Sequence, residues 1–303
     1  MPRTTPFVLV DVFTSRPFGG NQLAVFTDDA ALSAREMQEL AHEMNFSEST
    51  FVMPPETSGA RRVRIFTPRR EIPMAGHPTV GTTWVLASRG EIKLDSASVD
   101  ATLQLGIGPV TVTVESTNGR PDFVWMAHRE AEFGAKRDDV GRIAEALGIT
   151  AADIRDDLPV QSVSTGFPFA FVPLKTIDAL ARCVSNGSAL ATLFKTGDHM
   201  QPIYMFVANE PGEFAARSRM FAPHTDAISE DPATGSAAAP FGAYAAKYGL
   251  IKPAPKASFL IQQGVEMGRP SEIRVEVARK DNGAFAIRIG GRCVIVGEGS
   301  MFL

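Results

Sequence analysis

The amino-acid sequence predicts an α+β protein of two similar halves, each a curled β-sheet wrapped around one apolar helix. The first observation is a repeat, because residues 71–90 resemble residues 230–249, and Phe66 and Phe221, which precede the two copies, are 155 residues apart (221 − 66). Second, both halves consist otherwise of short segments with strand-like composition. Third, 303 residues are enough for two domains that each bury a core.

Each copy of the repeat contains a turn with a proline. We match residues 76–81 with residues 230–235, because Pro78 and Pro232 then each precede a glycine by three residues. A stretch of small, apolar residues follows each turn and ends close to a further glycine. The match predicts equivalent turns in the two halves, each leading into a helix.

These two helices are expected at residues 82–88 and 236–246. A polar N-cap, a proline at the first helical position and a glycine beyond the last turn are typical of helix ends, which makes His77 and Asp231 the predicted N-caps. A helix start presents unpaired N–H groups and a partial positive charge, which favours a small anion such as a carboxylate. We expect the two turns to share such a ligand if a pseudo-twofold axis relates the halves. For one copy alone, a well-capped core helix is the simpler explanation.

The first elements of the chain are a hairpin and a helix. Residues 7–13 and 23–26 are rich in β-branched and aromatic side chains on either side of a turn. Ser33 and Glu36 form a capping-box pattern, and apolar residues at helical spacing follow as far as Asn45. A strand pattern begins directly afterwards.

The rest of the chain mixes strand patterns with two helical stretches, residues 136–157 and 177–194. The strand patterns are at 63–66, 102–105, 110–114, 123–126, 161–174, 202–208, 214–221, 259–261, 273–277 and 285–290. We divide the chain into domains of residues 1–130 and 131–303. The sequence leaves open whether the last strand, residues 294–302, packs on the second domain or returns to the first.

Composition argues against several classes of function. Hydrophobic residues make up 44% and charged residues 21% of the chain, as in globular proteins. The net charge is −4 and no run of Lys or Arg exceeds a pair, so we expect no nucleic-acid partner. Cys183 and Cys293 fit neither a disulfide framework nor a zinc site, which agrees with a cytoplasmic protein without a metal. No signal-peptide or membrane-spanning pattern is present, so we expect no membrane partner.

The candidate acid/base residues near the turns are Glu48, Glu71, His77, Glu230 and Asp231. Dinucleotide-binding, P-loop, nucleophile-elbow and zinc-protease motifs do not occur, which argues against nucleotide, serine-hydrolase and metal chemistry. From spacing alone, Glu48 is a solvated carboxylate at the edge of a strand and His77 an ordinary helix cap.

Five motifs, in order along nearly the whole chain, resemble those of the PhzF-like family, named for an isomerase of phenazine biosynthesis. They are FGGN at 18–21, NFSES at 45–49, MAGHPT at 74–79, EDPATGSA at 230–237 and QGVEMGRPS at 263–271. One departure is Gln22, where many relatives have proline. The resemblance implies the diaminopimelate epimerase fold, with two similar domains, each a barrel-like sheet around a central helix, and the active site in the cleft between them. It also implies a homodimer and no cofactor.

The resemblance also implies roles for individual residues. Glu48 would be the general acid/base, and His77 and Asp231 would contact the substrate and assist a proton shift. The substrate would be a small carboxylate with an amino or hydroxyl group, and the model reaction is the isomerisation of trans-2,3-dihydro-3-hydroxyanthranilate. Three further residues would bind the substrate through backbone N–H groups or a hydroxyl: Gly76, Gly235 and Ser236.

The absence of cysteine from both turns separates two kinds of chemistry on this fold. Racemases of the fold invert a carbon with two thiols, one from each half. A single carboxylate can instead move a proton between two carbons on one face, for which Glu48 should be partly desolvated so that its pKa rises. The sequence therefore predicts a cofactor-independent isomerase. The alternatives are an amino-acid racemase or epimerase, and a non-catalytic small-molecule binding protein on the same scaffold.

Overall fold

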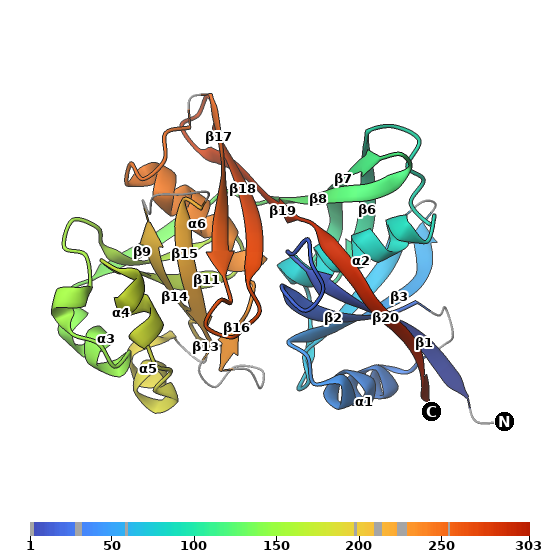
Figure 1. Ribbon diagram of the computed structural model, residues 1–303, viewed down its shortest axis with the longest axis horizontal. Coiled ribbons are helices and arrows are strands. Elements are labelled where there is room, and N and C mark those ends of the chain that lie inside the picture. The colour runs from blue at the N-terminus through green and yellow to red at the C-terminus, as the bar shows by residue number, and fades with distance from the viewer. Residues whose placement is uncertain are drawn as a thin grey trace. The chain divides into compact units, whose positions relative to one another are not determined.

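The computed structural model describes residues 3–27, 32–57, 60–196, 199–208, 214–222, 229–253 and 255–303 and divides into two compact units (Figure 1). Unit 1 comprises Met1–Ala127 together with Gly290–Leu303, and unit 2 comprises His128–Ile289. The chain therefore leaves the first unit, builds the whole of the second, and returns.

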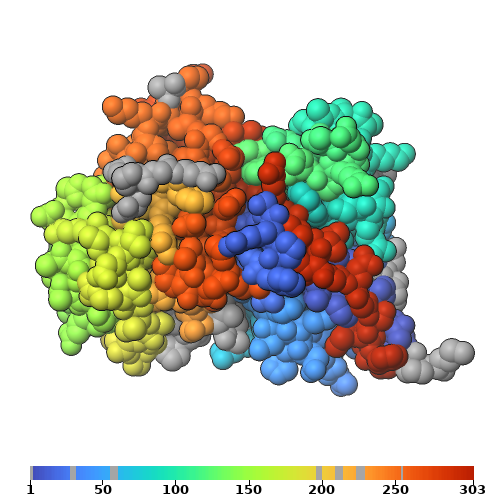
Figure 2. Space-filling view, viewed as in Figure 1, coloured from blue at the N-terminus to red at the C-terminus, as the bar shows by residue number. Residues whose placement is uncertain are grey.

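The sheet of unit 1 begins with β1 (Thr4–Val12), which is antiparallel to both β2 (Asn21–Phe26) and the C-terminal strand β20 (Cys293–Phe302). Figure 2 shows this last strand, in red, lying along the blue N-terminal segment. The strand whose place the sequence left open thus completes unit 1. The other strands are β3 (Glu48–Thr57), parallel to β2; β4 (Ala60–Phe66), antiparallel to β3; β5 (Glu71–Ile72), antiparallel to β4; β6 (Ser98–Leu105), parallel to β4; β7 (Gly108–Thr117), antiparallel to β6; and β8 (Arg120–His128), antiparallel to β7.

Unit 2 repeats this order of pairing. Its strands are β9 (Glu132–Arg137), antiparallel to β10 (Val160–Ser164); β11 (Pro168–Pro173), antiparallel to β10; β14 (Ile203–Ala208), parallel to β11; β15 (Ala216–Phe221), antiparallel to β14; β16 (Glu230–Asp231), antiparallel to β15; β17 (Lys256–Gln263), parallel to β15; β18 (Ser271–Arg279), antiparallel to β17; and β19 (Phe285–Gly291). A small separate pair joins β12 (Lys195–Thr196) to β13 (His199–Met200).

The two units therefore share one topology. The parallel pairs β2–β3 and β4–β6 of unit 1 correspond to β11–β14 and β15–β17 of unit 2. The outer strands also correspond. β20 pairs with β1 in unit 1, and β9 pairs with β10, the equivalent of β1, in unit 2. The predicted α+β fold of two similar halves is confirmed.

One apolar helix packs against each sheet, α2 (Gly76–Ser88) in unit 1 and α6 (Gly235–Lys247) in unit 2. Nearly all of their residues are buried, which explains why both helices are apolar on every side. Glycine permits the close approach. A Cβ on Gly81 would lie 2.6 Å from Val12 Cγ2, and one on Gly242 would lie 2.8 Å from a valine of β18.

The starts of these helices differ from the prediction. α2 begins at Gly76, six residues earlier than expected (82 − 76), and α6 begins at Gly235 with Thr234 as its N-cap. His77 is consequently the second residue of α2, and Asp231 lies in β16, so neither is an N-cap. In α2 the proline, Pro78, is the third helical residue, which is possible because N–H groups of the first turn lack intrahelical acceptors in any case. At α6 the matched proline, Pro232, precedes the N-cap Thr234 and lies outside the helix.

The match between the two turns also changes. Ile72 pairs with β4 as Asp231 pairs with β15, so these two residues are equivalent. Gly76 and Gly235 each begin the helix, and Gly90 and Gly249 follow the two helices with the same φ of 75°. The offset is thus 159 (235 − 76), and matching Pro78 with Pro232 was wrong. The link before the second turn is four residues longer than the first, and part of it lies outside the described residues.

The remaining helices are shorter than predicted except at the N-terminus. α1 (Ala34–Met44) has the predicted capping box of Ser33 and Glu36. The two helical stretches expected in the second half are broken into α3 (Val140–Ala146), a 3-10 turn (Ala151–Asp153), α4 (Ile177–Arg182) and α5 (Gly187–Phe194). Within the part of the chain that the structure describes, none of the helices has the length and apolar character needed to cross a membrane.

Candidate active site

Glu48 and His77 meet in unit 1. Glu48 is the first residue of β3 and lies beside Leu23 of the parallel strand β2. His77 is in the first turn of α2. The Glu48 carboxylate oxygen Oε2 is 3.4 Å from His77 Nδ1. The structure therefore brings together two of the three side chains predicted to be catalytic.

A second contact joins the same strand to the same helix. The hydroxyl oxygens of Thr50 and Thr82, both buried, lie 2.8 Å apart. Two residues along a strand span about 6.6 Å, and five residues along a helix span about 7.5 Å. The step from Glu48 to Thr50 therefore matches the step from His77 to Thr82. Two polar contacts hold β3 against α2 and fix the position of the carboxylate.

His77 is buried and neutral, whereas Glu48 keeps contact with solvent. Burial lowers the pKa of His77 from 6.5 to about 3, against the opposing effect of a hydrogen bond with the backbone of Gln22. The Glu48 side chain is 17% exposed. The Glu48 side chain is therefore partly open to solvent, while the neighbouring imidazole has no charge at neutral pH.

Asn21, the first residue of β2, contacts the same imidazole nitrogen. Its buried amide nitrogen Nδ2 is 3.2 Å from His77 Nδ1. An amide N–H can only donate, so with this amide orientation Nδ1 is the acceptor of the Asn21 contact. Nδ1 has a single lone pair, so it accepts either from Asn21 or from a protonated Glu48 at one time. Asn21 and Glu48 therefore share one ring nitrogen of His77.

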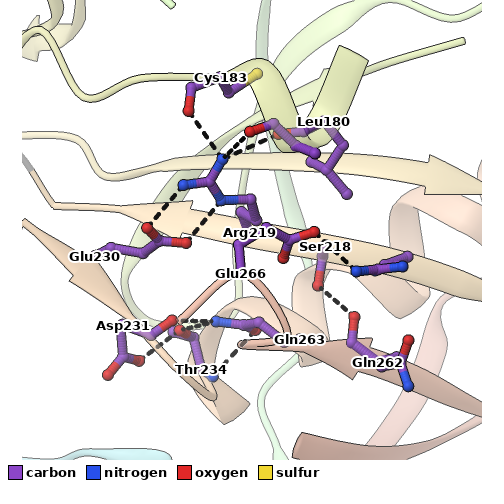
Figure 3. Close-up of polar contacts among 12 residues, drawn as sticks. Leu180, Cys183, Ser218, Arg219, Glu230, Asp231, Thr234, Gln262, Gln263 and Glu266 are labelled. Carbon is purple, nitrogen blue, oxygen red and sulfur yellow. Dashed lines mark hydrogen bonds and ion pairs between the residues drawn. The ribbon is translucent and has the colours of Figure 1, made fainter. Parts of the chain in front are cut away.

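Asp231 is in unit 2, in a network of buried polar groups (Figure 3). Its carboxylate oxygen Oδ2 accepts a hydrogen bond of 2.5 Å from the Thr234 hydroxyl. The side chain of Gln263, at the end of β17, donates to the Asp231 carbonyl oxygen at 2.8 Å and to Thr234 Oγ1 at 3.0 Å. Its own oxygen accepts from the Thr234 N–H at 3.2 Å. Asp231 is therefore held from both its side chain and its backbone.

The segment after Gln263 holds the turn that follows Asp231. Gly264 has a φ of 75°, and a Cβ there would lie 2.5 Å from the Pro232 carbonyl oxygen, so only glycine fits without a shift. The Ser271 hydroxyl donates to that same carbonyl at 2.8 Å. The QGVEMGRPS motif thus has a structural purpose, which is to fix the turn before α6.

Two other candidate acids are held in ion pairs. Arg219 binds Glu230 through both carboxylate oxygens, at 2.7 and 2.8 Å, and Arg64 binds Glu71 in the same way, at 2.7 and 2.6 Å. The hydrogen bond from Arg64 lowers the pKa of Glu71. Arg219 also donates to three backbone carbonyls near the end of α4, those of Leu180, Ala181 and Cys183 (Figure 3). Glu71 and Glu230 therefore anchor equivalent strands in the two units.

The two halves carry different groups at equivalent positions. Ser49 pairs with Phe66 as Ile203 pairs with the equivalent Phe221, so Glu48, one residue before Ser49, corresponds to Pro202. His77 is the second residue of α2, and Ser236 is the second residue of α6. Ile72 of unit 1 stands where unit 2 has Asp231. Unit 1 thus has the carboxylate and imidazole, and unit 2 has an apolar residue in place of Glu48.

The cysteines are not placed for proton transfer. Cys183 and Cys293 are buried, and burial raises the pKa of Cys183 to about 11 and raises that of Cys293 as well. Within the described ranges, no three side chains of His, Cys, Asp or Glu come together in a way that could hold a metal ion.

Spacing alone missed three residues of these networks: Asn21, Thr234 and Gln263. Each lies in one of the five motifs, but a motif does not say which of its side chains contact the candidate acids. Thr234 and Asp231 are three positions apart, but the other contacts join residues 29 to 56 positions apart, as between Thr234 and Gln263 and between Asn21 and His77.

Comparison with known proteins defines the class. The fold is shared with a crystal structure of a phenazine biosynthesis protein of the PhzF family from Bacillus anthracis, at a TM-score of 0.90 and 25% identity over 99% of this chain and 100% of the other. An uncharacterized isomerase of Mesorhizobium japonicum is 35% identical over 99% of this chain and 100% of its own length. The protein is an enzyme of the isomerase class.

The family follows from the sequence match. Residues 10–299 match the family described as phenazine biosynthesis-like protein, and the chain belongs to it. The trans-2,3-dihydro-3-hydroxyanthranilate isomerase of Pseudomonas chlororaphis is 33% identical over 98% of this chain and 99% of its own length. The resemblance seen in the five motifs is confirmed.

Proposed function

We propose that this isomerase shifts a proton or double bond in a small carboxylate that also carries an amino or hydroxyl group, without a cofactor. The observation that carries the proposal is the contact of 3.4 Å between Glu48 and His77, at a position where the other half has Pro202. Neither turn contains a cysteine, so inversion by a pair of thiols has no support here. Isomerisation on one face of the substrate needs a single group that takes a proton and returns it.

Glu48 is the group to which we assign both steps. The carboxylate removes a proton from one carbon and the resulting acid returns it to another. His77 supports the protonated stage when its Nδ1 lone pair turns from the Asn21 amide to the Glu48 acid. Since His77 is neutral, it adds no positive charge beside Glu48.

We assign the first turns of α2 and α6 to the binding of the negatively charged carboxylate of the substrate. The first backbone N–H groups of α2 and α6 have no intrahelical acceptor, and the positive end of a helix favours a carboxylate and the negative charge that develops during proton removal. On this basis Gly76 and Gly235 bind the carboxylate through their N–H groups, Ser236 adds its hydroxyl, and Asp231 receives an amino or hydroxyl group. The dihydro-3-hydroxyanthranilate isomerase named among the relatives supports this substrate class.

The test is proton NMR in deuterated water with trans-2,3-dihydro-3-hydroxyanthranilate and a panel of small amino and hydroxy acids. We expect isomerisation or deuterium incorporation with the wild type and a loss of at least about 100-fold in Glu48→Gln, the usual contribution of a general acid/base. The matched control is Glu71→Gln, which changes the same side chain in the same unit but outside the Glu48–His77 pair. Full activity of Glu48→Gln would remove the proposal. Inversion of a stereocentre would favour a racemase, and ligand binding without turnover would favour a binding protein.

A further inference from the structure

Thr234 is an unusual N-cap. A threonine at this position ordinarily accepts a hydrogen bond from an N–H group of the first helical turn, which stabilises a helix by about 1 kcal/mol. Thr234 precedes α6, yet its side chain makes no such bond. Its hydroxyl donates instead to Asp231 Oδ2 at 2.5 Å. Thr234 therefore contacts a candidate active-site carboxylate instead of capping the helix.

The direction of each hydrogen bond around Thr234 is fixed by Gln263. The Gln263 oxygen accepts from the Thr234 N–H at 3.2 Å, so its nitrogen is the atom that faces the Asp231 carbonyl oxygen at 2.8 Å. That nitrogen also lies 3.0 Å from Thr234 Oγ1 and can only donate to it. The hydroxyl oxygen is thereby an acceptor, and its own proton points to Asp231.

The consequence concerns the orientation of the Asp231 side chain. Its Oδ2 atom is the acceptor of the Thr234 hydrogen bond, so the side chain is held from this side. All three side chains are buried, Gln263 at 1%, Asp231 at 5% and Thr234 at 6% exposure, and water does not compete for these bonds. A carboxylate held in this way is placed to bind N–H and O–H donors.

We propose that Thr234 and Gln263 are positioning residues that hold Asp231 as a hydrogen-bond acceptor for the amino group of the substrate. The inference rests on the proposed function, in which Asp231 contacts the substrate, and it specifies which part of the substrate is recognised there. Asp231 then distinguishes an amino-substituted carboxylate from one that lacks the amino group. Proton transfer remains with Glu48.

The test measures this preference by binding, so that it does not depend on turnover. Isothermal titration compares anthranilate, which has an amino group beside its carboxylate, with benzoate, which lacks it. We expect the wild type to bind anthranilate at least about tenfold more tightly, the usual effect of a hydrogen bond to a charged group. The preference should vanish in Asp231→Asn, fall several-fold in Thr234→Val and Gln263→Leu, and return in Thr234→Ser, which restores the hydroxyl.

The control is Thr5→Val, since the buried Thr5 hydroxyl has no hydrogen-bond partner and its loss should leave the preference unchanged. Circular dichroism and thermal unfolding show that each variant is folded. With an active substrate, Thr234→Val should raise KM more than it lowers kcat.

Three results would overturn the inference. They are equal binding of anthranilate and benzoate by the wild type, an unchanged preference in Thr234→Val, and a loss confined to kcat, which would make Asp231 a proton donor. Failure of the proposed function is separate, because it appears as full activity of Glu48→Gln while the binding preference persists.

Discussion

The neutral state of His77 predicts that the protein loses stability in mild acid. In the unfolded chain its imidazole has a pKa of 6.5, and in the folded protein burial lowers this to about 3. Between these values the unfolded chain binds a proton that the folded protein does not. The stability that depends on the neutral form is complete above pH 6.5 and is lost as the pH falls towards 3.

The magnitude follows from the size of the shift. A pH of 5 is 1.5 units below the pKa of 6.5 that the side chain has in the unfolded protein. At 1.36 kcal/mol per unit, the free energy of unfolding falls by about 2 kcal/mol. This figure requires only that the folded pKa of His77 is well below 5. It is a large fraction of the stability of an ordinary domain, about 5–15 kcal/mol.

Urea unfolding at pH 7.5 and pH 5 measures the effect. Between the two pH values, the free energy of unfolding should fall by about 2 kcal/mol more in the wild type than in His77→Gln. A variant of an exposed histidine, His42→Gln, should behave like the wild type. A ring C–H NMR titration of His77 should show no midpoint above about pH 4. A midpoint at or above pH 6.5 would refute the reasoning, because the Glu48 carboxylate at 3.4 Å would then hold an imidazolium in an ion pair.

Two predictions concern stability alone. Gly81→Ala should destabilise the protein by about 1–3 kcal/mol through overpacking, because its Cβ would lie 2.6 and 2.7 Å from side chains of the adjacent strands. Gly141→Ala, with open space around it in a helix, should stabilise the protein by up to about 1 kcal/mol. Denaturant unfolding measures both effects, and equal effects would contradict the packing account. Arg219→Met should cost about 3–5 kcal/mol, because the buried Arg219 is the ion-pair partner of the part-buried Glu230 and the donor to three backbone carbonyls. The more exposed Arg64→Met should cost about 1 kcal/mol or less. Thermal unfolding of the two variants should differ accordingly, and equal costs would refute the role of burial.

Much of the fold could be predicted because its signals are local. The capping box of Ser33 and Glu36 and the glycines after the two central helices depend on residues within one helical turn, and the structure contains them. The repeat and the five motifs predicted the family, which the comparisons confirm. The starts of α2 and α6 were wrong, since Pro78 fits the third position of a first turn and Pro232 lies before its helix.

The roles of the acids were harder to predict, because those roles depend on partners elsewhere in the chain. Glu71 and Glu230 have the same side chain as Glu48, but arginines on neighbouring strands bind them. His77 was expected to cap a helix through its polarity, whereas burial inside the fold makes it a neutral acceptor for Asn21.

The sequence by itself determined the α+β class, the duplication, the family and the set of candidate residues, because periodicity, caps and motifs act over a few neighbouring positions. Only the tertiary structure decided which carboxylate faces an imidazole, which are held by arginines, and that Thr234 and Gln263 orient Asp231. Protonation and hydrogen-bond direction depend on burial and on groups tens of residues away, and the chain brings these together only when its sheets close around their helices.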